Sequence, residues 1–165
     1  MKVLVTGGAG YVGTTLLPLL LDRGYEVTVM DNLMYGGAAL VPFFRRPNFH
    51  FVTGDVRDPD ALAGAVRGMD VIVHLAAIVG YPACLKEPRL ATEVNLEAAQ
   101  SLASIVQDDQ LVLFASTGSN YGALGDAARQ RDLLERALRI ELRTGLRHLI
   151  SNIQTPKNCC ASRSP

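Results

Sequence analysis

The sequence has no net charge and no long apolar run, and each absence removes a class of protein. Its 16 basic side chains balance its 16 acidic ones, so the overall charge favours neither nucleic acid nor an anionic membrane as a partner. The densest apolar run, from Leu16 to Leu21, includes Pro18 and is much shorter than a membrane span. The apolar stretch at the N-terminus is too short for a signal peptide.

Cysteine is also scarce, and two of the three cysteines are adjacent: Cys84, Cys159 and Cys160. An odd number that includes a neighbouring pair is a poor framework for disulfide bonds, which favours a reducing compartment. Cys84 has no His or Cys at metal-ligand spacing, so the sequence predicts no metal site. With 48% hydrophobic and 19% charged residues, the composition is that of an ordinary globular domain. We therefore expect a soluble, cytoplasmic protein.

Short β-branched runs alternate with helical patterns along most of the chain. The alternation predicts strands at 2–6, 26–30, 49–53, 70–75 and 110–115, and helices at 11–23, 59–67 and 90–106. The run from 32 to 47 contains two glycines and two prolines, so we expect a long, partly irregular connection there. Strands joined by helical crossovers predict an α/β fold of the Rossmann type, a doubly wound parallel sheet with helices on both faces.

Three glycines, Gly7, Gly10 and Gly13, lie between the first predicted strand and the first predicted helix. In a dinucleotide-binding turn, glycines allow a tight bend, a close approach of the backbone to a pyrophosphate, and close packing of helix on strand. The free N–H groups and the dipole of the helix N-terminus attract the anion. Such a triplet alone is a weak signal, because glycine-rich turns are common.

An acidic residue strengthens the signal, since Asp31 ends the second predicted strand, roughly 20 residues beyond the glycines. A carboxylate there accepts hydrogen bonds from ribose hydroxyls and repels a 2′-phosphate, which favours NAD over NADP. Arg45 and Arg46 follow in the next connection and argue in the opposite direction. The plain alternative is a set of turn glycines followed by an ordinary aspartate at a strand end.

Five segments carry a resemblance to a known family: TGGAGYVG (6–13), DNL (31–33), GDVRD (54–58), HLAA (74–77) and FASTGSNYG (114–122). In order and spacing they resemble the extended short-chain dehydrogenase/reductase family, in its nucleotide-sugar epimerase/dehydratase branch. The resemblance implies an NAD-binding Rossmann domain over residues 1–125, with a nucleotide sugar as the substrate of the parent family. The C-terminal lobe that forms the sugar pocket in such enzymes is missing, so the fold is expected to be truncated.

The resemblance also implies roles for individual residues. Those expected at the cofactor are Gly7, Gly10, Tyr11, Val12, Gly13, Asp31, Asn32, Leu33, Asp55, Val56, Leu75, Ala76, Ala77, Val79 and Asn95. Within this set, 11–12 match the pyrophosphate contact, 31–36 the adenosine ribose, and 55–56 the adenine, with Asp55 accepting from the adenine amino group. Residues 75–79 match the middle of the cofactor, and Asn95 matches its nicotinamide end. Thr117 aligns with the catalytic Ser/Thr that hydrogen-bonds the reacting oxygen of the substrate.

Each of these roles has a structural alternative. Asp55 precedes Pro59 and is also suited to a turn or a helix cap. Asn95 is also compatible with a solvated position on a helix, and Thr117 with ordinary turn chemistry. His74 ends an apolar strand, and we interpret it as a hydrogen-bonded core histidine with no catalytic role.

The family's chemistry, as the resemblance implies it, needs a Tyr-x-x-x-Lys pair on the helix after Thr117, near position 142. A lysine one helical turn away lowers the pKa of the tyrosine, which then acts as general acid or base. Here those positions hold Leu142 and Leu146, and no tyrosine in the chain has a lysine four residues later. We therefore predict no turnover from this chain alone.

The character of the sequence changes after Gly125. Residues 126–150 predict an Arg/Leu-rich helix in place of the catalytic one, and 151–165 predict a disordered tail. A frame change in the coding region would produce such an ending. Three functions follow: a partial epimerase or dehydratase that retains NAD affinity, a non-catalytic NAD-binding or regulatory module, or an unstable fragment. In the second, the 126–150 helix would dock on a partner or form a homodimer.

Overall fold

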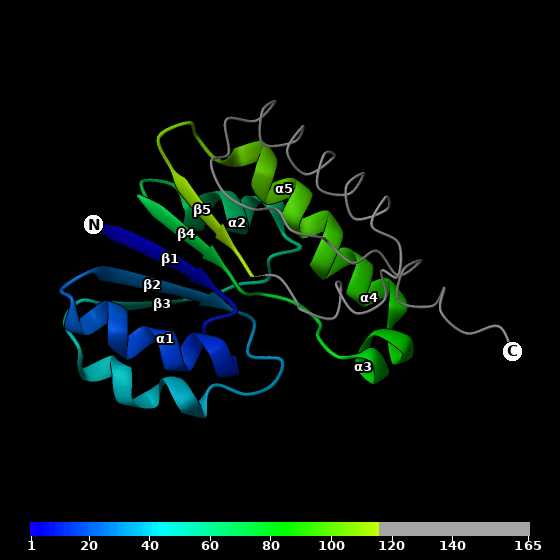
Figure 1. The fold of residues 1–165 in the computed structure, drawn as a ribbon, viewed down its shortest axis with the longest axis horizontal. Coiled ribbons are helices and arrows are strands. Elements are labelled where there is room, and N and C mark those ends of the chain that lie inside the picture. The colour runs from blue at the N-terminus through cyan, green and yellow to red at the C-terminus, as the bar shows by residue number, and fades with distance from the viewer. Residues whose placement is uncertain (116–165) are drawn as a thin grey trace, which may run out of the picture.

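The computed structural model describes residues 1–115, which form a five-stranded parallel sheet with helices on both faces (Figure 1). The strands are β1 (Lys2–Thr6), β2 (Glu26–Asp31), β3 (Phe49–Thr53), β4 (Val71–His74) and β5 (Leu111–Phe114). Their order in the sheet is β3-β2-β1-β4-β5. The chain adds β2 and β3 on one side of β1, and then crosses over to add β4 and β5 on the other side of β1. The predicted Rossmann-type parallel sheet is confirmed.

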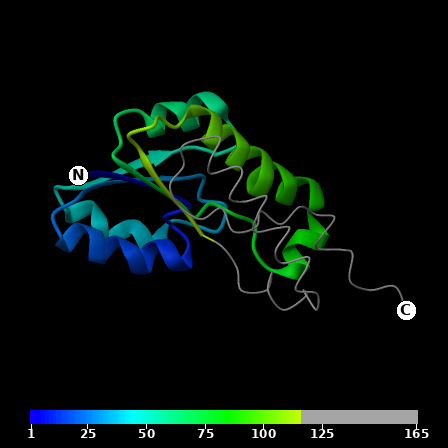
Figure 2. The same cartoon turned by 45° about the horizontal axis from the view of Figure 1, so that its top comes forward.

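Helices connect each strand to the next. They are α1 (Tyr11–Asp22), the 3₁₀ helix η1 (Ala38–Arg45), α2 (Pro59–Val66), α3 (Tyr81–Lys86), α4 (Pro88–Thr92), the π-helical turn η2 (Glu93–Glu97) and α5 (Ala98–Ile105). Figure 2 shows α1 and η1 against one face of the sheet and α2 and α5 against the other. The helix predicted at 126–150 and the tail predicted at 151–165 lie outside the described residues.

Two hydrophobic clusters fill the layers between sheet and helices. Successive strand residues point to opposite faces, so Val3 and Val5 pack with Leu17 and Leu21 of α1, while Leu4 packs with Leu102 of α5 and its neighbours. All six of these side chains are buried. Because the central strands are covered on both faces, their sequences are almost continuously apolar, which is typical of parallel sheets.

Local sequence signals explain where several elements begin and end. Asp58 caps α2 by accepting hydrogen bonds from the backbone N–H groups of Asp60 and Ala61, and Pro59 occupies the first turn. Gly24, at φ +77°, ends α1 in the left-handed conformation. None of the helices among residues 1–115 combines the length and apolarity needed to cross a membrane.

The structure agrees with one detail of the sequence-based prediction and corrects another. The connection at 32–47 is partly irregular, as predicted, and also contains η1. The helix predicted at 90–106 begins earlier, at Pro88, and a π-helical turn interrupts it between α4 and α5. A short additional helix, α3, precedes it with a proline in its first turn. The π-turn contains Asn95, whose tertiary contact is described below, and periodicity alone does not reveal the turn.

Candidate functional site

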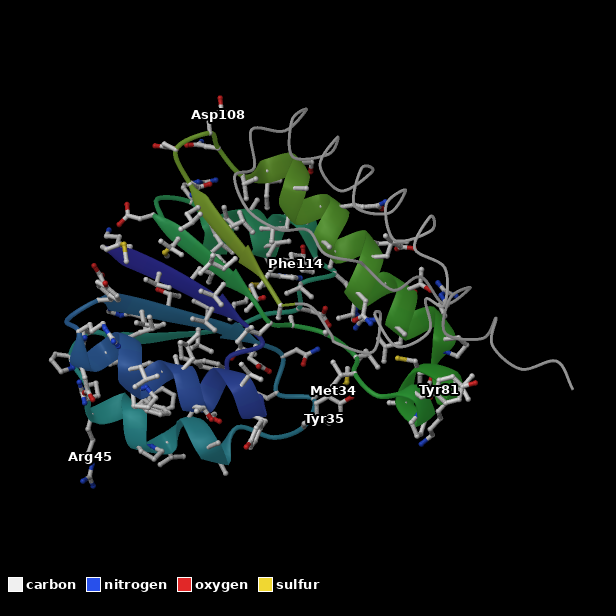
Figure 3. All side chains as sticks on the ribbon, viewed as in Figure 1. Met34, Tyr35, Arg45, Tyr81, Asp108 and Phe114 are labelled. Atoms are coloured by element: carbon white, nitrogen blue, oxygen red, sulfur yellow. The ribbon has the colours of Figure 1, made fainter. Side chains whose placement is uncertain are left out.

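A cleft of about 360 Å³ opens at the carboxyl ends of the strands, beside the point where the strand order reverses. Such switch points are where open α/β sheets bind ligands. Every cofactor-site residue predicted from the sequence lines this cleft except Leu33 and Asn95. Met34, Tyr35 and Ile78 also line it. Figure 3 shows Met34 and Tyr35 beyond the carboxyl ends of the strands. Tyr81 lies beyond the same edge of the sheet.

The glycine turn between β1 and α1 forms one wall of the cleft. Gly7 adopts φ +69°, and a Cβ on it would lie 2.6 Å from the backbone of Ala76. A Cβ on Gly13 would lie 2.5 Å from the carbonyl oxygen of Gly8, so that site admits only glycine without movement of the backbone. Gly10 caps α1 without any side-chain hydrogen bond, and the first turn carries no acidic residue. The N-terminal amides of α1 are therefore available to an anion.

Asp31 links the glycine turn to the loop after β2. One carboxylate oxygen accepts from the Ala9 N–H at 3.0 Å, and the other from the Leu33 N–H at 2.8 Å. Each oxygen keeps a further lone pair, so the carboxylate is oriented and still able to accept from a diol. Leu33 itself has φ +58°, a left-handed conformation that is rare for a branched apolar residue. Its contribution to the site is therefore the shape of the loop.

The two arginines that favoured NADP in the sequence do not supply a cation to this loop. Arg46 forms an ion pair with Asp22 of α1 at 2.7 Å. Arg45 extends into solvent at the far end of η1 from Met34 and Tyr35 (Figure 3). The carboxylate of Asp31 thus lies without either positive charge beside it, which disfavours a 2′-phosphate.

Asp55 and Arg57 form the centre of an ion-pair network on another side of the cleft. Arg57 Nη2 lies 2.7 Å from Asp55 Oδ2, and its Nη1 lies 3.0 Å from Glu93 Oε2. Arg89 pairs with the same Glu93 at 2.8 Å. The Arg57 guanidinium holds the pKa of the Asp55 carboxyl well below its usual range, and Arg89 and Arg57 together lower the pKa of Glu93. Both acids therefore stay ionised at neutral pH.

The alternative roles of Asp55 are settled in part by this geometry. The cap of α2 is Asp58, so Asp55 is not that cap. Asp55 does close a local turn, because its Oδ1 accepts from the Arg57 N–H at 2.9 Å. Sequence reasoning missed Arg57, although the residue stands within the GDVRD segment that carries part of the resemblance.

Asn95 lies in η2, and its side chain forms two hydrogen bonds with the backbone of Ile78. Its Oδ1 accepts from the Ile78 N–H at 2.8 Å, and its Nδ2 donates to the Ile78 carbonyl at 2.9 Å. Ile78 belongs to the segment 75–79 that lines the cleft. The side chain is thus not a solvated one, and its polar atoms are turned to this segment. Single π-turns within helices often occur at functional sites, and here the turn carries the residue that fixes a wall of the cleft.

His74 is a core histidine, as predicted. It is 2% exposed, its Nδ1 lies 2.8 Å from Thr6 Oγ1, and its ring contacts that of Phe114 with centroids 4.9 Å apart. Burial lowers the pKa of His74 to about 4, so the ring is neutral near pH 7. Thr117 and the positions 142 and 146 lie outside the described residues. Within residues 1–115, no group of three or more His, Cys, Asp or Glu side chains is placed to hold a metal ion.

Comparison with known proteins gives a consistent result. The sequence pattern of the NAD dependent epimerase/dehydratase family matches residues 3–140. A dTDP-glucose 4,6-dehydratase of Streptomyces niveus is 33% identical over 138 residues, which cover 78% of this chain and 41% of that protein. A 3-beta-hydroxysteroid dehydrogenase of Mycolicibacterium neoaurum is 35% identical over 128 residues, covering 75% of this chain and 33% of that protein.

Among solved structures, the chain resembles the dTDP-glucose 4,6-dehydratase DesIV of Streptomyces venezuelae, a double mutant crystallised with NAD bound. The TM-score is 0.69 at 36% identity, and the match covers 77% of this chain and 42% of that one. The chain therefore spans less than half the length of these relatives. The family match at residues 3–140 includes the residues that line the cleft.

Proposed function

The chain belongs to the NAD dependent epimerase/dehydratase family, and we propose that residues 1–115 bind NAD as part of a nucleotide-sugar epimerase or dehydratase. The observation that carries the proposal is the pairing of an uncapped helix N-terminus with an oriented carboxylate across one cleft. The first suits a pyrophosphate, and the second suits the hydroxyls of a ribose. The S. venezuelae structure was solved with NAD bound, and the likeness of the two folds supports the same ligand here.

The residues present fit the cofactor. The amides at the start of α1, next to Gly10, would receive the pyrophosphate, and the remaining lone pairs of Asp31 would receive the adenosine ribose. Val56 and the segment 75–79 provide mainly apolar walls, which suit a purine and the middle of the dinucleotide. Bound NAD supplies a hydride acceptor and donor. What this chain's described residues contribute is binding, orientation and exclusion of solvent from the cleft floor.

We predict that the proposed binding is not accompanied by turnover in this chain alone. The sequence offers three lysines, Lys2, Lys86 and Lys157, and none lies four residues after a tyrosine. Without a lysine to lower the tyrosine's pKa, the proton transfer that accompanies hydride movement lacks its general acid or base. The nucleotide-sugar substrate belongs to the proposed parent activity, and the steroid dehydrogenase among the relatives shows that similar N-terminal parts occur with other substrates.

A second candidate function is a non-catalytic NAD-binding or regulatory module. The absence of the Tyr-x-x-x-Lys pair from the whole sequence favours it, because binding without chemistry is what such a module needs. A homodimer and a cytoplasmic location remain predictions under either function. A turnover assay with UDP-glucose and dTDP-glucose separates the two, since product formation would exclude a purely non-catalytic role.

Calorimetric titration with NAD and NADP tests the binding proposal directly. We expect NAD to bind more tightly than NADP, and Asp31→Ala to weaken NAD binding about tenfold or more, by loss of the ribose hydrogen bonds and of the two loop contacts. Asp108→Ala is the matched control, because Asp108 is an exposed acid in the turn before β5, away from Met34 and Tyr35 (Figure 3). Unchanged NAD affinity in Asp31→Ala would refute the placement of the ribose.

A further inference from the structure

The outer edge of the sheet at β3 presents backbone groups that no neighbouring strand uses. β3 is the last strand on its side of the described sheet and pairs with β2 alone (Figure 1). The Asn48 carbonyl and the Gly54 N–H both form hydrogen bonds with β2. Successive residues of a strand direct their backbone groups to opposite sides, so the even-numbered residues from 48 to 54 face β2. The residues whose backbone groups face away from β2 are Phe49, Phe51 and Thr53.

Most of these outward groups have no partner within residues 1–115. The Phe49 N–H donates to the Arg46 carbonyl at 3.1 Å, and no other hydrogen bond reaches this edge from the described part of the chain. The donors that remain are the N–H groups of Phe51 and Thr53, and the acceptors are the carbonyl groups of residues 49, 51 and 53. A row of unpaired N–H and C=O groups is a template for pairing with another strand.

The strand lacks the devices that usually keep such an edge unpaired. Natural edge strands carry lysine, proline or a bulge for this purpose. β3 reads Phe-His-Phe-Val-Thr, and its register with β2 is continuous. Apolar side chains lie exposed beside it, since Val52 is 42% exposed and Phe44 is 60% exposed. The Phe44 ring packs against that of Phe51, with centroids 6.1 Å apart, so this apolar surface is continuous with the edge.

A second copy of the same strand, placed antiparallel, matches these groups. With Phe51 opposite Phe51 of the second copy, each Phe51 N–H faces the other Phe51 carbonyl, and each Thr53 N–H faces the other Phe49 carbonyl. The pairing uses every free donor of both edges, and the Phe49 N–H keeps its bond to Arg46. On the opposite face of the sheet, each His50 lies beside Val52 of the other copy. No like charges meet along the strands, and aromatic cross-strand pairs stabilise such contacts.

Charges at the two ends of β3 also favour an antiparallel partner. Arg45 precedes the strand and extends into solvent (Figure 3), whereas Asp58 and Asp60 follow the strand and are exposed. Arg57 lies before these two acids, but its charge is balanced by ion pairs with two others. An antiparallel pairing brings the basic end of one strand beside the acidic end of the other. A parallel pairing would bring like charges together, which is unfavourable.

We propose that β3 is a dimerisation edge, at which the β3 strands of two copies pair antiparallel about Phe51 and join the two sheets into one. Because both copies use the same edge, the pairing is closed and stops at a dimer. This surface differs from the 126–150 helix, through which the sequence-based expectation places a homodimer. The inference goes beyond the proposed function and does not depend on it.

Sedimentation equilibrium of the full chain over a range of concentrations tests the proposal. A contact of four backbone hydrogen bonds and a few apolar side chains lies at the small end of protein interfaces, so we expect a dissociation constant of about 10–100 µM. Thr53→Pro removes one outward donor from each copy, and with it two of the four hydrogen bonds. We expect it to weaken the dimer by about tenfold or more. Thr53→Val keeps the N–H group and is the matched control, with an expected change within about threefold.

A second pair of variants tests the same edge through side chains alone. Phe44→Glu replaces an exposed ring beside Phe51 with a charge that meets its own counterpart in the dimer, and we expect it to weaken association by about tenfold or more. Leu85→Glu is its control, because Leu85 is 45% exposed on α3, well away from β3 (Figure 1). Urea unfolding checks that each variant is folded. The Thr53 N–H is not bonded to β2, and proline is tolerated at edge positions whose N–H faces solvent.

The inference is overturned if the unaltered protein remains a monomer at about 300 µM, well above the expected dissociation constant. It is also overturned if dimers persist unweakened in Phe44→Glu and in folded Thr53→Pro, since another surface would then hold them. Equal weakening by Leu85→Glu or Thr53→Val would show that the effect is not specific to this edge. Assemblies larger than a dimer would contradict the closed two-fold pairing.

Discussion

Replacing Asn95 by alanine removes both hydrogen bonds that hold Ile78, and the consequence follows from the burial of that residue. Ile78 is 5% exposed, so its backbone N–H would lose its partner where water has little access, and its carbonyl would keep only the weak donor Cys84 Sγ at 3.5 Å. Each buried backbone group left without a partner costs about 1–3 kcal/mol. Asn95 is half-buried, so the vacated space admits water to one of the two groups, and we expect a loss of about 2 kcal/mol in the free energy of unfolding.

The same substitution should affect ligand binding, because the segment 75–79 forms one wall of the cleft. Loosening that wall adds an ordering cost to binding, and we expect NAD affinity to fall about tenfold. Urea unfolding and calorimetric titration measure the two effects. Gln100→Ala is the control, because Gln100 is exposed on α5. Full NAD affinity in a destabilised Asn95→Ala protein would refute the view that this clamp shapes the cleft.

Two further substitutions and a pH effect follow from the site and the core. Gly13→Ala places a Cβ 2.5 Å from the Gly8 carbonyl oxygen, and we expect it to abolish NAD binding in calorimetry, whereas Gly64→Ala, at a position with open space around it, should bind normally. Burial lowers the pKa of His74 to about 4 in the folded protein, while the same imidazole in the unfolded chain has a pKa near 6.5. Stability should therefore fall by up to about 3 kcal/mol as the pH drops from 6.5 to 4, as urea unfolding at each pH would show. His50→Gln should keep this dependence and His74→Phe should remove it.

The sequence predicted those parts of the site in which each residue's role depends on its neighbours in the chain. The spacing of Gly7, Gly10 and Gly13 reflects what one turn between a strand and a helix needs, and the structure shows a steric reason at two of the three positions. Asp31 was found because it ends a strand beside that turn. Strand positions were likewise predictable, because residues buried on both faces of a sheet give short, β-branched apolar runs.

The contacts that the sequence did not reveal join residues that lie far apart in the chain. Asn95 contacts a backbone 17 residues earlier in the sequence, and Arg57 contacts an acid 36 residues later. Nothing in the local pattern around Asn95 indicates that its side chain holds a loop. The contact depends on the position of Ile78, and only the folded chain supplies it.

The Arg57–Glu93 ion pair and the Asn95–Ile78 hydrogen bonds connect two walls of the cleft to the same helical turn. Arg57 ties the loop after β3 to Glu93, and Asn95, on the same π-turn, ties that turn to Ile78 after β4. The loop after β3 and the segment after β4 are therefore both held by one short helical segment. We expect a change at either loop to displace η2. Substitutions at Arg57 and Asn95 should therefore not be additive in their effect on NAD affinity, because residues coupled through a shared element show interaction energies of about 0.5–3 kcal/mol. Strict additivity in the double substitution would mean that the two walls are held separately, and that the π-turn only connects α4 to α5.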